Sequence, residues 1–227
     1  MRRSERLRTR DRLLAAAGAA FAARGYRGAP LREIAERAGA NLASANYYFG
    51  SKQKLYLEVA RAEFERLEER IAERGAAVAP ETLDSLSRSA LIELLHTRIR
   101  TTLEALLDPG SIHGKLMQRE LAEPSEVLPV IVRRHIDPLR RSMDAILERL
   151  EPRLGREEVE RCTRSVMGQI GFYLTHRPAL LLLMGQRAYP PGFTKELADH
   201  VTEFSLGGIE RLARKHRTPR APKERSE

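Results

Sequence analysis

The sequence predicts an all-α protein, and three observations support this fold class. Residues that favour helices, chiefly Ala, Leu, Glu and Arg, dominate the 227-residue chain. Stretches that alternate apolar and polar residues between turns, as β-strands do, are hard to find. Apolar residues make up 42% of the chain, Trp is absent, and aromatic residues make up 5%. We therefore expect a helical protein whose core is built mainly from aliphatic side chains.

A basic segment precedes the first predicted helix. Residues 1–9 are expected to form a flexible basic arm. Thr9 can cap a helix that runs to about Arg24, because its hydroxyl can accept from the free N–H groups of a first turn. Gly25 ends this helix, since glycine readily takes the left-handed conformation that closes one.

Two short helices with the pattern of a helix-turn-helix follow. The first has apolar residues spaced i, i+3, i+4 and i+7, at Leu31, Ile34, Ala35 and Ala38. A turn at 39–41 ends it, and Asn41 can cap the next helix, from Leu42 to about Phe49. A helix this short is unstable alone. We therefore expect its neighbours to hold it, as in a helix-turn-helix that presents side chains to the DNA major groove.

The remaining chain is predicted to form a series of mostly longer helices. Ser51 caps a long helix at about 52–74, and Gly75 to Pro80 form a linker and a candidate domain boundary. Further helices are expected at about 82–107, 111–122, 125–150 (capped by Ser125 and bent near Pro129 or Pro138), 157–176, 178–184 and 194–216. The chain then divides into the arm (1–9), a head (10–56), a larger helical domain (57–216) and a disordered tail (217–227).

Charge is distributed unevenly along the chain. Residues 1–60 hold 12 Lys and Arg against 5 Asp and Glu, and residues 211–227 hold 7 against 2, whereas residues 61–210 carry a net charge of −3. A basic head on a mildly acidic body is typical of a nucleic-acid-binding end joined to another unit. The alternative is that Arg is simply the preferred residue of solvated surfaces in this protein.

The segments that resemble a known family are Gly25-Tyr26, Leu31-Arg32-Glu33-Ile34-Ala35, Ala38-Gly39, Tyr47-Tyr48-Phe49, Ser51-Lys52 and Leu55. Over residues 25–55 the chain resembles the TetR family of bacterial transcriptional regulators. It departs from the family pattern at Ala29-Pro30, where members usually carry Ser or Thr, and at Asn41 and Asn46, where they usually carry Ser and an aromatic residue. With Asn at both positions, and with segments 116–141 and 165–178, the chain is similar to the CecR-like subgroup.

The resemblance implies a TetR-type helix-turn-helix DNA-binding domain at 10–56 and a ligand-binding and dimerisation domain at 57–216. Carried over residue by residue, the contacts to double-stranded DNA are Arg32, Leu42, Ala43, Ser44, Asn46, Tyr47, Tyr48 and Lys52. An Asn side chain can pair with adenine through two hydrogen bonds, and Lys52 lies at a helix N-terminus that favours anions. Some of the aromatic residues could be core instead, as Ala45 and Phe49 are expected to be.

The resemblance also implies a homodimer built through the last two long helices and a small-molecule effector of unknown identity. Polar residues on apolar helices can line a pocket, and the candidates here are His113, Met117, Arg119, Glu120, Gln169, Phe172 and Tyr173. Each could instead be a satisfied interior or interface group. The long helix at 52–74 is the expected lever between this pocket and the head.

Several function classes are excluded. The six His residues show no metal spacing, and the chain has no HExxH motif, no Gly-rich phosphate loop and no Cys–His dyad. We therefore expect no enzyme and no cofactor or metal. Cys162, the single cysteine, excludes an internal disulfide, and any redox role for it stays open. No apolar run reaches membrane-spanning length, so we expect a cytoplasmic protein without a membrane partner.

We therefore expect a ligand-responsive transcriptional regulator, a repressor that binds a palindromic operator as a homodimer and is released by an effector. One alternative is a helical DNA-binding protein without an effector, regulated by protein partners. Another is an enzyme or carrier that uses the helical domain for a hydrophobic small molecule. The sequence does not identify the operator or the target genes, and it does not separate a repressor from an activator.

Overall fold

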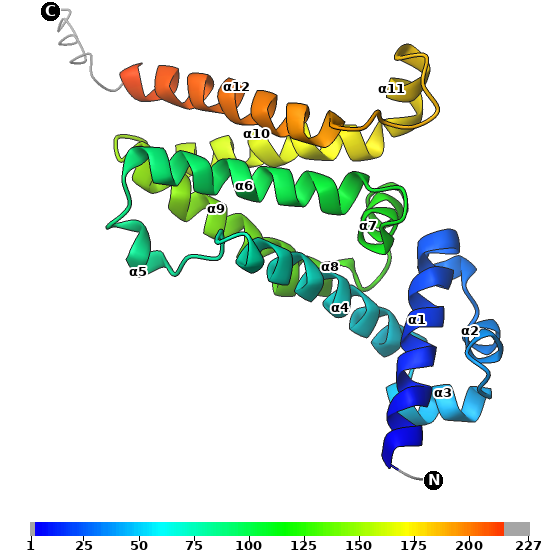
Figure 1. The fold of residues 1–227 in the computed structure, drawn as a ribbon. Coiled ribbons are helices and arrows are strands. Elements are labelled where there is room, and N and C mark those ends of the chain that lie inside the picture. Colours follow the sequence, from blue (N-terminus) through cyan, green and yellow to red (C-terminus); the bar gives the residue numbers. More distant parts are fainter. Residues whose placement is uncertain (1–2, 216–227) are drawn as a thin grey trace, which may run out of the picture.

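The computed structural model describes residues 3–215, and every regular element in that range is helical. A small head lies at one end and consists of α1 (Arg3–Gly28), α2 (Leu31–Arg37) and α3 (Leu42–Phe49) (Figure 1). From the head, α4 (Lys52–Glu73) runs into a larger body. The predicted all-α class, with a small helix-turn-helix head joined to a larger helical domain, is confirmed.

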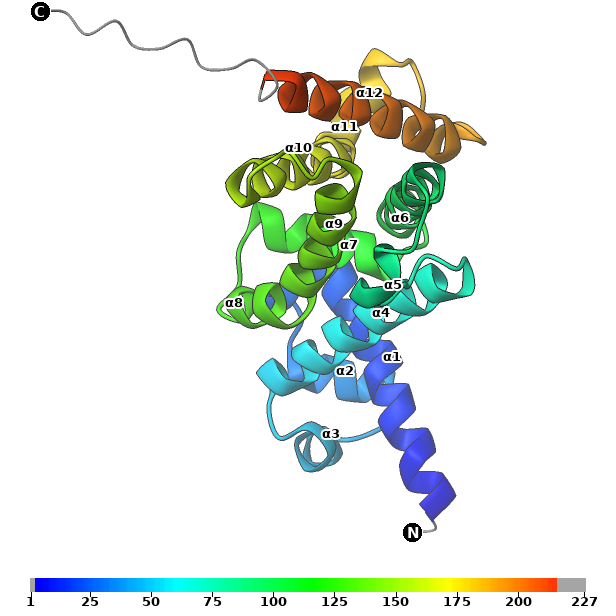
Figure 2. The same ribbon diagram turned by 90° about the vertical axis from the view of Figure 1, so that its left-hand side faces the viewer.

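The body contains α5 (Pro80–Leu83), α6 (Arg88–Leu107), α7 (Ile112–Ala122), α8 (Leu128–Ile131), a π-helical turn η1 (Val132–Ile136), α9 (Asp137–Leu150), α10 (Arg156–Thr175), α11 (Arg177–Leu183) and α12 (Phe193–Lys215). Figure 2 shows α10 and α12 in the layer farthest from the head, with α6 and α9 beneath them. The short α7 packs against α1, so the head touches the body there as well as through α4.

Buried rings and small side chains hold the head together. Phe21 on α1 and Tyr56 on α4 are fully buried, with ring centroids 4.8 Å apart, and Tyr26 lies 5.2 Å from Tyr56. From α3, Ala45 and Phe49 enter the same core. Because a helix of eight residues is not stable alone, this burial is what fixes the position of α3.

The core of the body is aliphatic, as the composition predicts. Leu95, Ile99 and Leu103 on α6 are fully buried and belong to the same cluster as Leu147 on α9 and Val159 on α10. Close contact between α6 and α7 depends on Gly114, because a Cβ atom added there would lie 2.1 Å from the carbonyl oxygen of Leu106.

The N-terminal arm is the first correction to the predicted organisation. Residues 3–9 are the first turns of α1, which begins at Arg3. The hydroxyl of Thr9 donates to the carbonyl of Glu5 at 3.0 Å, as a residue inside a helix does, and so it does not cap the helix. Residues 1–2 of the arm and the predicted tail at 217–227 lie outside the described residues.

Two of the longer predicted helices are interrupted. The helix predicted at 82–107 divides into α5 and α6, because Ser87 accepts from the backbone N–H of Ala90 and starts a new helix at Arg88. The helix predicted at 125–150 divides into α8, η1 and α9. The π-helical turn ends two residues before Pro138, whose ring and missing N–H disturb regular helical bonding.

Candidate nucleic-acid interface

The third helix presents one face to solvent and the other to the core. Its first turn is closed by the side chain of Asn41, which accepts from the backbone N–H of Ser44 at 2.8 Å. The sequence predicted this cap, and the structure confirms it. With Ala45 and Phe49 held inside, the opposite face of α3 points away from the head (Figure 1). The helix is therefore both rigid and accessible.

Five of the predicted DNA contacts are exposed, namely Arg32, Leu42, Ala43, Asn46 and Tyr47, and Ser44 is half-buried. The ring of Tyr47 is 69% exposed, and it meets the ring of Tyr48 edge-on at 5.2 Å. Arg32, on α2, forms an exposed ion pair with Glu36 at 3.0 Å. An ion pair this exposed contributes little stability, so the guanidinium of Arg32 can exchange Glu36 for another anion.

Two of the predicted contacts point inward in the structure. The hydroxyl of Tyr48 is buried without a hydrogen-bond partner, so it does not face a phosphate. The amino group of Lys52 donates to the carbonyl of Arg27 at 3.3 Å and lies 4.9 Å from the ring of Tyr26. The hydroxyl of Tyr48 is therefore enclosed, and the amino group of the half-buried Lys52 is engaged with α1.

The electrostatic surroundings of Lys52 agree with that placement. Burial lowers the pKa of its amino group, and the positive charge of Arg24 lowers it further, while the carboxylate of Glu126 partly opposes both.

Two basic residues beside α3, Arg6 of the predicted basic arm and Lys54, were not assigned as DNA contacts from the sequence. The extended α1 places the guanidinium of Arg6 5.9 Å from the ring centroid of Tyr47. Lys54 is exposed in the first turn of α4, where Ser51 accepts from its backbone N–H at 3.1 Å. The sequence signal for Lys54 was available, because Lys54 stands only two residues after Lys52, in the first turn of the same predicted helix.

The seven candidate effector contacts do not share one pocket. His113, Met117 and Glu120 line the inner face of α7 and are buried. Burial lowers the pKa of His113 to about 4, and the charge of Arg70 adds to this. The ring of His113 meets that of Phe64 edge-on at 4.7 Å. These three are interior residues.

Glu120 is the centre of a buried hydrogen-bond network. Its carboxylate accepts from the hydroxyl of Tyr56 at 2.6 Å, and from the backbone N–H and the hydroxyl of Ser125 at 3.1 and 3.0 Å. Burial raises the pKa of the Tyr56 hydroxyl, and the hydrogen bond to Glu120 raises it further. The network joins α4 to the end of α7. Ser125 serves this network and does not cap a helix, which corrects the predicted role of Ser125.

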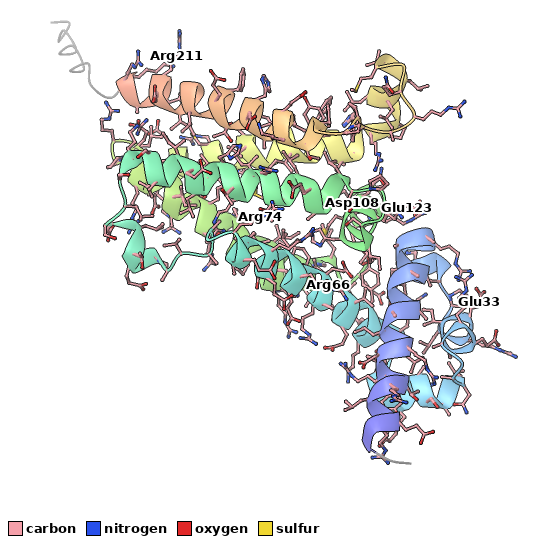
Figure 3. All side chains as sticks on the ribbon, in the orientation of Figure 1. Glu33, Arg66, Arg74, Asp108, Glu123 and Arg211 are labelled. Carbon is pink, nitrogen blue, oxygen red and sulfur yellow. The ribbon has the colours of Figure 1, made fainter. Side chains whose placement is uncertain are left out.

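An open groove of about 760 Å³ lies where α1 meets α7, and we call it the junction groove. Its lining includes Arg24, Arg27, Lys115, Arg119 and Glu123. Figure 3 shows Glu123 at the end of α7, beside the end of α1 that faces the body. Arg119 and Glu120 are the two candidate effector contacts that border this groove.

The other three candidates lie on α10. The amide of Gln169 donates to the hydroxyl of Ser205 on α12 at 3.0 Å. Tyr173 is half-buried, and its carbonyl accepts from the hydroxyl of Tyr189 at 2.7 Å. Phe172 is 44% exposed. They therefore belong to the outer layer of the body, away from the junction groove.

That outer layer and the adjoining α11 together carry most of the large apolar side chains exposed in the body, among them Phe172, Leu182, Leu183, Phe204 and Leu212. A second cavity of about 530 Å³ lies between α10 and α12 and includes Cys162 in its lining. Burial raises the pKa of the Cys162 thiol, which keeps it in its less reactive form.

Residues 3–215 contain neither a metal-type cluster nor a membrane-spanning helix. No three His, Cys, Asp or Glu side chains of that range come together in a way that could hold a metal ion. None of its helices combines the length and the apolar character needed to cross a membrane.

The chain matches two protein families along its length. Residues 13–59 match the bacterial regulatory proteins of the TetR family, and residues 91–209 match the C-terminal domain of the HTH-type transcriptional dual regulator CecR. The CecR regulator of Shigella flexneri is 33% identical over 135 residues, which are 57% of this chain and 59% of the relative. The HTH-type transcriptional repressor AcnR of Corynebacterium efficiens is 35% identical over 86 residues, which are 35% of this chain and 46% of the relative.

Both alignments thus span less than two thirds of the curated relative. Among solved structures, AibR in complex with isovaleryl coenzyme A and operator DNA is similar in fold, with a TM-score of 0.58 at 15% identity. The similarity covers 86% of this chain and 97% of that one.

Proposed function

Since this chain belongs to the TetR family of bacterial regulators and carries a C-terminal domain of the CecR type, we propose that it regulates transcription by binding a palindromic DNA operator as a homodimer. In this proposal it acts as a repressor in the cytoplasm, not as an enzyme, and a small-molecule effector releases it from DNA. The observation that carries the proposal is the outer face of α3, where Asn46 and Tyr47 are exposed on a helix anchored from its other side.

In this proposal, two kinds of contact bind DNA: contacts to base edges and contacts to phosphates. Asn46 and Ala43 are suited to base edges, because an amide can pair with adenine and a methyl group can touch that of thymine. Arg6, Arg32 and Lys54 are exposed around α3 and are suited to phosphates, which fix the position of the protein without reading sequence.

Two asparagines on the same short helix test this assignment. Asn46→Ala removes an exposed amide, so it should change the preferred base at one operator position at a cost of about 1–3 kcal/mol and leave stability unchanged. Asn41→Ala removes the cap and should instead cost about 1 kcal/mol of stability while weakening all DNA sequences alike. Binding to a library of randomised duplexes, together with thermal unfolding of each variant, separates the two effects. A uniform loss in both variants would contradict base reading by Asn46.

Dimerisation through the outer layer is supported by the exposed apolar side chains of that layer. Phe204 on α12 is 66% exposed, and such a surface is more stable when a second copy covers it. Two heads in one dimer would place two copies of α3 about 34–36 Å apart, one turn of DNA.

Sedimentation should give about twice the chain mass of 25.7 kDa. Phe204→Glu should give a monomer with weaker operator binding. Leu121→Glu, which places the same charge at an exposed apolar position of α7, should stay dimeric. A wild-type monomer that binds a palindrome tightly would refute the dimer.

Three similar proteins support the proposal of control by an effector. AcnR is named a repressor and CecR a dual regulator, and AibR was solved with both a small molecule and operator DNA. The competing proposal is regulation by a protein partner without an effector. Operator affinity that no small molecule alters, but a second protein does, would favour that alternative.

A further inference from the structure

The junction groove has the size and the lining of a ligand site. Its volume of about 760 Å³ lies within the range of small-molecule pockets. Ala22 and Ile112 contribute apolar wall, from α1 and α7 respectively. Because the two walls belong to the head and to the body, anything bound there contacts both units at once.

The chemistry of the lining favours a negative charge. Arg24, Arg27, Lys115 and Arg119 border the groove, against the carboxylates of Glu120 and Glu123. The carboxylate of Glu120 is already engaged by Tyr56 and Ser125. Among residues 3–215, neither Arg27 nor Lys115 has an ion-pair partner, in contrast to most arginines of the body.

Arg24 has buried hydrogen-bond donors that lack an acceptor. One of its terminal nitrogens pairs with Glu33 at 2.6 Å, but Nε and the other terminal nitrogen are buried without any acceptor. A buried donor without a partner costs about 1–3 kcal/mol. An anionic oxygen in the groove removes that cost when the Arg24 side chain turns these nitrogens toward it.

Arg119 connects the groove to the orientation of the head. Its guanidinium donates to the carbonyls of Ala22 and Ala23, with Nε 3.3 Å from the former. Gly25 (φ +71°) interrupts the helical backbone of α1 just beyond these carbonyls. Arg119 therefore attaches the end of α1 to α7 through neutral acceptors.

We propose that the junction groove binds a small organic anion with an apolar portion, and that this anion takes Arg119 away from the end of α1. The guanidinium is charged in both cases, but an anion adds the attraction of a full opposite charge that a carbonyl lacks, so Arg119 transfers to the anion. The head then loses one of its attachments to the body and changes its angle. The groove lies at the end of α1 remote from α3 (Figure 1), so a ligand there does not compete directly with DNA. This regulatory role rests on the proposed function.

The test uses 1-anilinonaphthalene-8-sulfonate, an aromatic anion that fluoresces in apolar surroundings, and its uncharged relative N-phenyl-1-naphthylamine. The wild-type protein should bind the sulfonate once per chain. Arg24→Gln and Lys115→Gln should each weaken it about 10-fold or more, whereas the uncharged probe should not distinguish them. Arg211→Gln, which removes a cation from the cavity between α10 and α12, is the matched control and should bind like the wild type. Octanoate and octyl phosphate as competitors then separate a carboxylate from a phosphate ligand.

The effect of the anion on DNA affinity is measured with a duplex selected from a library of random sequences. Saturating sulfonate should lower the wild-type affinity for this duplex about 5- to 150-fold, and Arg119→Gln should abolish that dependence. Equal sulfonate binding by the wild type, Arg24→Gln and Lys115→Gln would overturn the site, as would a loss confined to Arg211→Gln. Binding in the groove with unchanged DNA affinity would overturn the switch. If no duplex is selected at all, the proposed function fails, while the sulfonate titration still decides the groove.

Discussion

Acidification should destabilise this protein through one buried histidine, His113 on α7. Its pKa is about 4 in the folded protein against an ordinary 6.5, because burial disfavours the charged ring and Arg70 repels it. As the pH falls, the unfolded chain takes up this proton first. The contribution of His113 to stability is therefore complete above pH 6.5 and is lost between pH 6.5 and about 4.

The size of this effect follows from the two pKa values. Between about pH 7 and about pH 5, the linkage relation gives a loss of about 2 kcal/mol in the free energy of unfolding. Burial of His135, which also lowers its pKa, adds a loss of the same sign. Replacing His113 alone therefore isolates its share.

The assay is urea unfolding followed by far-ultraviolet circular dichroism, at a fixed protein concentration because a dimer's stability depends on it. His113→Phe keeps a ring against Phe64 and cannot be protonated. Over the same pH interval, the free energy of unfolding of this variant should fall by about 2 kcal/mol less than that of the wild type. Only the difference in pH dependence matters, so any packing cost of the larger ring cancels. Parallel losses in the two proteins would refute the reasoning.

Three further substitutions test the connections between elements, each by urea unfolding. Gly114→Ala should destabilise by about 3 kcal/mol or more, since its Cβ would lie 2.1 Å from the carbonyl oxygen of Leu106; wild-type stability would mean that α6 and α7 are not so close. Tyr56→Phe should cost about 1.5–3 kcal/mol, because it removes a buried hydrogen bond to Glu120, and no loss would show that this bond is absent. Gly25→Ala should cost about 1–2 kcal/mol, because φ is +71° there; a neutral result would place Gly25 in an ordinary helical conformation.

The local features of the head could be predicted because their signals are local. The caps at Asn41 and Ser51 and the end of the first helical stretch at Gly25 each depend on a few neighbouring residues, and the structure shows all three. The interruption before α6 depends on Ser87 in the same way. It was missed because the surrounding residues also favour one continuous helix.

The direction of single side chains could not be predicted, because it depends on residues far away in sequence. Lys52 and Lys54 look alike near a helix start, and only the carbonyl of Arg27 and the ring of Tyr26 turn Lys52 inward. On α7, the spacing of His113, Met117 and Glu120 is that of one helix face. That spacing could have shown that the three residues belong together, but not that Phe64 and Tyr56 cover them.

The structure also changes which contact between head and body is expected to control the orientation of the head. The sequence pointed to the long helix at 52–74 as the lever, since it alone joins head and body along the chain. Tyr56 and Glu120 fasten that helix to α7 with a buried charge-assisted bond, which is costly to break. The bonds from Arg119 to the end of α1 are only partly buried or exposed, at the edge of an open groove. A ligand with limited binding energy can rearrange the second attachment and not the first, so the head should pivot about the Tyr56–Glu120 contact while the end of α1 moves.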